Sequence, residues 1–269
     1  MLKTRIITAV ALGTVLFAIL LGLPKIATVI LLTGIVLAGA WEWAAFLRDP
    51  RPIVRLAYVA LIAALLPLAW WLTASPAGRT AVIAGAVAWW VVALLWVVFA
   101  PQRVARWSAA LAGVLALIPC WVALLRLRVD LDNRLGAQWV LFILILVCMA
   151  DVGAFFVGRR FGRVRLAPHV SPGKTWEGVL GGAGVSAVVA LAGSGWFGIP
   201  ALWFVPLCLA AVAFSVVGDL TESLLKRFAG VKDSGTLFPG HGGVMDRIDS
   251  VTGAAPVLFF GLLALGVVT

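Results

Sequence analysis

The most polar stretch of this chain reads SLLKRFAGVKDSGTLFPGHGGVMDRID, residues 223–249. It combines four cations, three aspartates and one of only two histidines: Lys226, Arg227, Lys232, Arg247, Asp233, Asp246, Asp249 and His241. Long apolar runs surround this stretch, and polar groups beside lipid need hydrogen-bond partners or water. We therefore expect the chemistry of the protein to lie here.

The composition predicts an integral membrane protein. Of 269 residues, 63% are hydrophobic and 12% are charged, whereas about 25% are charged in soluble domains. Apolar runs of roughly 18–22 residues recur along the chain, long enough to cross a bilayer as helices. We predict an all-α polytopic protein with about nine transmembrane helices and a cytoplasm-facing polar site between the C-terminal ones. The predicted spans are 6–23, 26–47, 53–73, 80–100, 107–125, 136–158, 176–194, 199–220 and 250–268.

The basic residues predict the orientation. With nine spans, the amino terminus and the loops after the even-numbered spans share one side, which carries 16 of the 21 Lys and Arg residues. Such an excess marks the cytoplasmic side. In the cell (inner) membrane the N-terminus and the polar segments 159–175 and 221–249 would then face the cytoplasm, and the C-terminus the outside. The net charge of +10 is explained by these loops and anionic lipid headgroups rather than by nucleic acid.

The chain is one membrane unit with two regions. Residues 1–130 are interpreted as a scaffold of helices, compatible with a homodimer, and residues 131–269 as the catalytic region. The three cysteines, Cys120, Cys148 and Cys208, lie inside apolar runs, without disulfide or zinc spacing. Glu42 also lies in an apolar helix. An ionisable residue there is either paired internally or part of the site, and both interpretations stay open.

The segment HVSPGKTWEG, residues 169–178, predicts a turn that leads into a helix. Thr175 or Ser171 would cap this helix, and Glu177 lies in its first turn. A helix N-terminus with Lys174 and hydroxyl groups nearby is also able to bind phosphate. From these residues alone, a cap and a phosphate site are equally good interpretations.

Carboxylates gather at two further helix ends. Asp219, Glu222, Ser223 and Lys226 are spaced by three or four residues and share a helix face. Asp246 and Asp249 share another face if the last helix starts near Val244. Clustered carboxylates repel one another unless cations intervene. Their oxygens suit Mg²⁺, while the lysines, arginines and glycine N–H groups suit anions. We infer a site for metal and phosphate together.

The stretch 223–249 resembles the signature of the phosphatidate cytidylyltransferases, also called CDP-diacylglycerol synthases. The upstream blocks DVGAFFVGRRFG, residues 151–162, and SPGKTWEG, residues 171–178, resemble the same family. Two positions depart from its pattern: Phe155, where tyrosine is common, and Gly173, where lysine is usual. The resemblance is specific in the C-terminal half and covers the first half only as a similar multi-helix pattern.

The resemblance implies transfer of the CMP moiety of CTP to phosphatidic acid in the bilayer, which yields CDP-diacylglycerol and pyrophosphate for phospholipid synthesis. It implies Mg²⁺, with room for a second cation, on Asp219, Asp246 and Asp249. Catalytic roles fall to Asp246, Asp219, Lys226 and His241, although His241 is equally suited to a loop-stabilising hydrogen bond. The implied substrate-binding residues are Ser171, Lys174, Thr175, Glu177, Ser223, Arg227, Lys232, Asp233, Gly242, Gly243 and Arg247. Arginines between 159 and 165 would attract the lipid headgroup.

Two other functions remain open. One is a CTP-using lipid kinase, such as a polyprenol kinase, whose product from CTP would be CDP rather than pyrophosphate. The other is a transporter for anionic lipid, in which intramembrane acids form a pathway. A transporter would need polar residues spread through several mid-membrane helices, whereas here they gather at one side.

Overall fold

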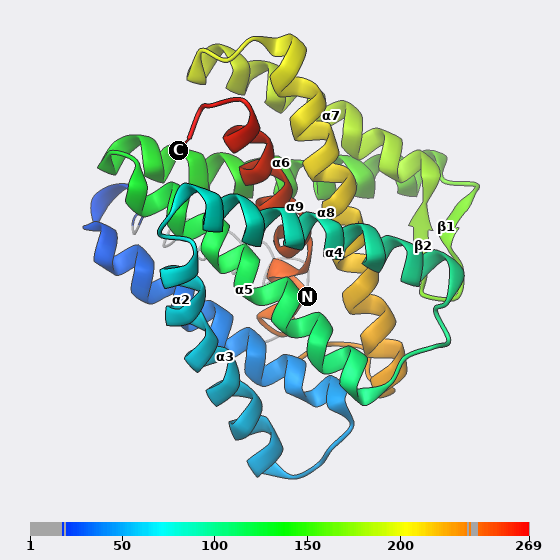
Figure 1. The fold of residues 1–269 in the computed structure, drawn as a ribbon. Coiled ribbons are helices and arrows are strands. Elements are labelled where there is room, and N and C mark those ends of the chain that lie inside the picture. The colour runs from blue at the N-terminus through cyan, green and yellow to red at the C-terminus, as the bar shows by residue number, and fades with distance from the viewer. Residues whose placement is uncertain (1–17, 19, 236, 238–241, 269) are drawn as a thin grey trace.

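The computed structural model describes residues 18, 20–235, 237 and 242–268 (Figure 1). Eight helices in this part are long and apolar enough to cross a membrane, which confirms the all-α polytopic class. The elements are α2 (Lys25–Trp43), the short 3-10 helix η1 (Ala44–Leu47), α3 (Pro52–Leu72), α4 (Pro76–Phe99), α5 (Arg106–Asp130), α6 (Asn133–Phe161), β1 (Arg165–Ala167), β2 (Ser171–Thr175), α7 (Trp176–Phe197), α8 (Ala201–Ala229) and α9 (Met245–Ala264).

Eight of the nine predicted spans correspond to these helices, and the first, 6–23, lies almost wholly outside the described residues. Two helices extend beyond their predicted membrane spans, as the predicted polar faces at 219–226 and 246–249 required. Helix α8 continues to Ala229 rather than 220, and α9 begins at Met245 rather than 250. Hydropathy falls at these two helix ends because they carry charged side chains, but the helical backbone continues through them.

Helices α5 and α9 form the interior of the bundle and are the most buried of the described spans. Figure 1 shows α9 among the other helices, with α2 and α3 towards one side and α7 towards the other. Helix α9 packs against α8, α5 and α4. The carboxylates at its start are therefore surrounded by protein, which supplies the partners that lipid lacks.

A small hairpin that we did not predict lies between α6 and α7. Strands β1 and β2 pair antiparallel, with Arg165 opposite Thr175 and Ala167 opposite Ser171. Thr175 ends β2 and caps α7, since its hydroxyl accepts a hydrogen bond from the Gly178 N–H at 3.2 Å. The predicted turn is thus a hairpin, and Thr175 is the cap of the helix. Figure 1 shows this hairpin at the edge of the bundle beside α7.

Helices α8 and α9 approach each other to backbone contact at two glycines. A Cβ atom on Gly218 would collide with the Asp249 carbonyl oxygen, and one on Gly253 with the Phe214 carbonyl oxygen. Small residues at such crossings allow helices in membranes to pack closely. Asp219 follows one of these glycines directly, so the crossing brings the carboxylates of the two helices into one region.

The cations predicted on the non-cytoplasmic side are mostly bonded inside the protein. The Arg126 guanidinium lies 3.6 Å from the centre of the Trp70 ring and 3.3 Å from the Asp130 carboxylate. Arg79 pairs with the same aspartate at 3.1 Å, and the buried Arg128 donates to Asn133 Oδ1 at 2.9 Å. These contacts join the ends of α3, α4, α5 and α6 and satisfy charges that would otherwise be costly beside lipid.

The α8–α9 contact leads to a stability prediction. Gly218→Ala should lower the free energy of unfolding by about 1–3 kcal/mol, because the new methyl group meets a backbone carbonyl that has little room to move. Gly184→Ala on α7 is the matched control, since nothing lies within 4 Å of its Cβ position. The measurement is thermal unfolding in detergent micelles. Equal midpoints for the two variants would contradict the close crossing.

Candidate active site

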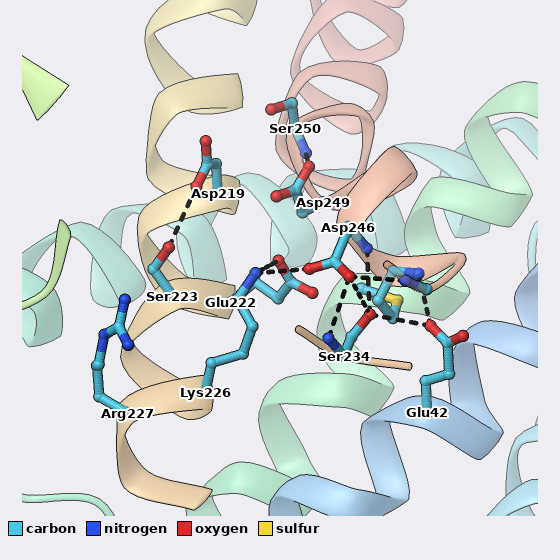
Figure 2. Close-up of polar contacts among 12 residues, drawn as sticks. Glu42, Asp219, Glu222, Ser223, Lys226, Arg227, Ser234, Asp246, Asp249 and Ser250 are labelled. Carbon is cyan, nitrogen blue, oxygen red and sulfur yellow. Dashed lines mark hydrogen bonds and ion pairs between the residues drawn. The ribbon is translucent and has the colours of Figure 1, made fainter. Parts of the chain in front are cut away.

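Lys226 joins two carboxylates at the junction of α8 and α9 (Figure 2). Its Nζ lies 2.7 Å from Oε2 of Glu222, one turn earlier on α8, and 2.7 Å from Oδ1 of Asp246, in the first turn of α9. On the same helix, the Ser223 hydroxyl donates to Asp219 at 3.3 Å. The polar face predicted for α8 is therefore present and bonded internally.

The second oxygen of Asp246 binds the loop that precedes α9. Oδ2 accepts hydrogen bonds from the Gly243 N–H at 2.8 Å, the Ser234 N–H at 3.1 Å and the Ser234 hydroxyl at 2.9 Å. Gly242 has a φ of 80°, a left-handed conformation that favours glycine. A Cβ on Gly242 would also collide with the Asp246 carboxylate. The loop and the aspartate thus fix each other.

Glu42 reaches the same loop from the N-terminal half of the chain. Its side chain is 7% exposed, and its carboxylate accepts hydrogen bonds from the N–H groups of Val244 at 3.0 Å and Met245 at 2.8 Å. The Ser234 hydroxyl also contacts it at 3.0 Å. Glu42 therefore binds the free backbone donors at the start of α9. Of the two interpretations left open for Glu42, the structure displays internal hydrogen bonding.

The carboxyl groups of Glu222 and Asp249 lie next to each other near Lys226. Glu222 is 1% exposed, and its side chain adjoins that of Asp249 on α9. Among the described atoms, Oε1 of Glu222 is buried without a hydrogen-bond partner. Because two carboxylate oxygens are both acceptors, their contact needs a proton or a cation between them.

Lys174 connects this region to the hairpin. Its ammonium group forms an ion pair with the Asp219 carboxylate. Both residues line a cavity of about 640 Å³ between α6, the hairpin, α7 and α8. Asp151, Arg159 and Arg165 line the same cavity. Segments 151–175 and the C-terminal half of α8 therefore meet around one polar space.

The other predicted residues of the hairpin region lie in the hairpin or directly after it. Thr175 lines it while capping α7. Glu177 accepts from the Val164 N–H through both carboxylate oxygens at 3.2 Å, and so fastens the turn after α6. Ser171 begins β2 and pairs with Ala167. Substrate contact by these three residues remains a prediction.

Several predicted residues lie further from the cavity. Arg227 points away from the carboxylates in Figure 2, and its Nε lies 3.4 Å from the Val170 carbonyl oxygen. Lys232 and Asp233 are exposed on the loop after α8, and Arg247 is exposed on the first turn of α9. His241 lies outside the described residues. The roles assigned to these residues remain predictions.

The three predicted metal ligands do not meet as one group. In the part of the chain that the structure describes, no group of three or more His, Cys, Asp or Glu side chains is placed to hold a metal ion. Asp219 is paired with Lys174, and Asp246 with Lys226. Asp249 accepts instead from the Ser250 N–H at 2.6 Å. The buried, unpartnered Oε1 of Glu222 is where this arrangement suits a cation.

Sequence reasoning left out residues that the structure places in the site. Glu222 lies at the correct helical spacing from Asp219 and Lys226, and that spacing could have added it to the site. Arg159 and Arg165 were predicted only as part of the arginine cluster that attracts the lipid headgroup, and Asp151 was included only as the first residue of the block 151–162. Ser234 carried no signal of its own, since serine is common in loops.

The fold and this geometry define a polytopic membrane protein with a polar site of paired carboxylates and lysines at the ends of its C-terminal helices. The sequence model of the Cytidylyltransferase family matches residues 3–265. The phosphatidate cytidylyltransferase of Haemophilus influenzae is 40% identical over 280 residues, which cover 95% of this chain and 96% of that protein. The protein of the same name from Pseudomonas aeruginosa is 42% identical over 273 residues, covering 99% and 98%. The chain belongs to the cytidylyltransferase family.

Substitution of Glu42 tests whether its hydrogen bonds fix the start of α9 and the loop before it. Glu42→Ala removes the acceptor of three buried donors and should lower the free energy of unfolding by about 1–3 kcal/mol. Because Ser234 also holds Asp246, we expect activity to fall roughly tenfold, which corresponds to about 1.4 kcal/mol in the barrier. Glu42→Gln keeps one acceptor oxygen and should lie between Glu42→Ala and the unchanged protein.

The control is Asp49→Asn, at a carboxylate just after η1 that pairs with Arg51 at 2.9 Å. Its free energy of unfolding should change by less than about 1 kcal/mol and its activity by less than about twofold, because its partner Arg51 is 70% exposed and pairs open to water contribute little. Thermal unfolding in micelles and kcat report the two effects. If Glu42→Ala behaved like Asp49→Asn, Glu42 would not be holding the start of α9.

Proposed function

We propose that this protein transfers the cytidylyl group of CTP to phosphatidate, giving CDP-diacylglycerol and pyrophosphate. The observation that carries the proposal is the cavity shared by Lys174, Arg159, Arg165 and Asp219. It combines cations suited to phosphate with carboxylates in one polar space. The names of the relatives from Haemophilus and Pseudomonas support the same reaction.

The chemistry needs no nucleophile from the protein. A phosphate oxygen of phosphatidate attacks the α-phosphorus of CTP, forming a new P–O bond. The bond from the α-phosphorus to the bridging oxygen breaks, and pyrophosphate leaves with that electron pair. The protein has to bring two anions together and offset their repulsion, so catalysis consists of positioning and electrostatic stabilisation.

The cationic side chains that would offset the phosphate charges lie at two places, the polar cavity and the α8–α9 junction. Lys174, held by Asp219, and the exposed arginines 159 and 165 present positive charge to the polar cavity. Lys226 is held between Glu222 and Asp246, which keeps its ammonium group in place for a phosphate group that comes to the α8–α9 junction. Fixed charges of this kind need no rearrangement during the reaction.

We also propose that the reaction depends on Mg²⁺. Bound magnesium would neutralise charge on the triphosphate. Oxygen ligands are what this ion prefers, and the carboxyl groups of Asp249 and Glu222, with the unpartnered Oε1 of the latter, supply them beside Asp219 and Asp246. A second cation, contact with anionic lipid and a homodimer are further expectations from the sequence.

The alternatives predict other products. A kinase acting on a lipid alcohol would release CDP from CTP. A transporter would need polar groups through the middle of several helices, whereas the paired carboxylates described here gather at the end of α8 and the start of α9. The contacts favour a site at one end of the bundle.

The activity test uses purified protein in mixed micelles with CTP and phosphatidate. We expect release of pyrophosphate and formation of CDP-diacylglycerol. Asp246→Asn should lower kcat roughly 10²–10³-fold, because it weakens both the Lys226 pair and the loop contacts. The matched control is Asp132→Asn, which keeps a capping side chain at the start of α6, at the other end of that helix from the cavity.

Chelation by EDTA should abolish turnover, and added Mg²⁺ should restore it. Formation of CDP in place of pyrophosphate would identify a kinase. An Asp246→Asn variant as active as Asp132→Asn would remove Asp246 from the active site.

We propose further that the polar cavity faces the cytoplasm and that the protein lies in the inner membrane. The excess of basic residues on the loops at this end supports that orientation. Helix α6 has 29 residues, about 43 Å at 1.5 Å per residue. Its two flanks, near Asp132 and Arg163, are therefore on opposite sides of the bilayer.

Labelling of single cysteines tests the orientation. In an active parent whose Cys120, Cys148 and Cys208 are replaced by alanine, Arg163→Cys should react with a membrane-impermeant maleimide only from the cytoplasmic side. Asp132→Cys should react only from the opposite side. Both native residues are exposed, so neither should be shielded by protein. The reverse pattern would place the cavity outside the cell, away from CTP.

A further inference from the structure

A second cavity, of about 380 Å³, adjoins the polar one. Its walls come from the end of α4, the turn of the hairpin, the start of α7 and the middle of α8. The side chains that line it are almost all apolar. Val179 and Val216 line both cavities, so the apolar space and the polar space meet at these two residues. We call the second cavity the apolar groove.

The rim of the apolar groove is formed by exposed hydrophobic side chains. Val98 on α4 is 57% exposed and Trp176 at the start of α7 is 52% exposed, and both line the groove. Its deeper wall contains the buried residues Val97 and Leu220. In a membrane-spanning bundle, exposed apolar side chains of this kind face lipid. The groove is therefore accessible from the hydrocarbon region, while its neighbour carries charged groups.

We propose that the apolar groove binds one acyl chain of a phosphate-bearing glycerolipid whose headgroup occupies the polar cavity. The inference rests on the proposed function for the identity of the headgroup. Lys174, Arg159 and Arg165 lie beyond the two shared valines and complement a phosphate. Hydrocarbon on one side of these valines and anion-binding groups on the other match the two ends of a single amphiphile. The groove then determines which chain lengths are used well.

Ala213 offers a way to fill the groove. It lines the groove from α8 and its small side chain is exposed, so a tryptophan there would occupy the space. Ala210, one turn earlier on the same helix, is also exposed and does not belong to the lining. Ala213→Trp and Ala210→Trp therefore form a matched pair. Val98→Trp places the same bulk at the rim from a different helix.

The first measurement compares kcat/KM for dioleoyl and dihexanoyl phosphatidate. Ala213→Trp and Val98→Trp should lower the value for the long-chain substrate roughly tenfold or more, the effect expected of a filled apolar pocket. The value for the short-chain substrate should change less than about twofold, which would also show that the variants are folded. Ala210→Trp should leave both substrates unchanged. Equal losses on both substrates in both groove variants would overturn the proposal.

The second measurement does not depend on turnover. Phosphatidate with a diazirine midway along one acyl chain should, on irradiation, label peptides containing residues 94–98 and 213–217 of the unchanged protein. Excess unlabelled phosphatidate should compete with this labelling. If the protein formed CDP-diacylglycerol but these peptides carried no label, acyl-chain binding in the groove would be contradicted, and the proposed function would be unaffected. If unlabelled phosphatidate suppressed the labelling but the protein formed no CDP-diacylglycerol, the result would support lipid binding in the groove and contradict the proposed function.

Discussion

The ammonium group of Lys226 lies between a carboxylate of α8 and a carboxylate of α9, 2.7 Å from each. Glu222 is almost completely buried, so the loss of this cation would leave an uncompensated charge inside the bundle. The same ion pairs hold the two helices at one relative position. The backbone contacts at Gly218 and Gly253 allow the helices to come close enough for a lysine to join them.

The hydrogen bonds around Asp246 extend this arrangement to the rest of the chain. One of its oxygens faces Lys226, and the other accepts from the loop at Ser234 and Gly243. That loop in turn contacts Glu42 on α2. A charged side chain is costly in a membrane protein unless its partners are fixed, and here each partner is fixed by another element. Rigid placement of charge is also what a reaction between two phosphate anions requires.

Much of the fold followed from the sequence because the bilayer imposes a length on apolar helices. Local patterns were equally informative: the spacing from Asp219 to Lys226 predicted one polar face, and Thr175, which caps α7, was one of the two predicted caps. The hairpin was missed because strands as short as Arg165–Ala167 contain too few residues to display an alternating pattern. Glu42 could not be assigned because its partners lie far away in the sequence and are mainly backbone N–H groups, which every residue except proline has.

Glu42 and Val244 are 202 positions apart, which has a consequence for the synthesis of the protein. A ribosome that adds roughly 5–20 residues per second needs about 10–40 s to make the intervening chain. During that interval α2 carries a carboxylate whose hydrogen-bond donors have not yet been made. Insertion of the earlier helices therefore leaves an incomplete protein with an unsatisfied acid. The arrival of α9 is the step that turns a set of inserted helices into a finished enzyme.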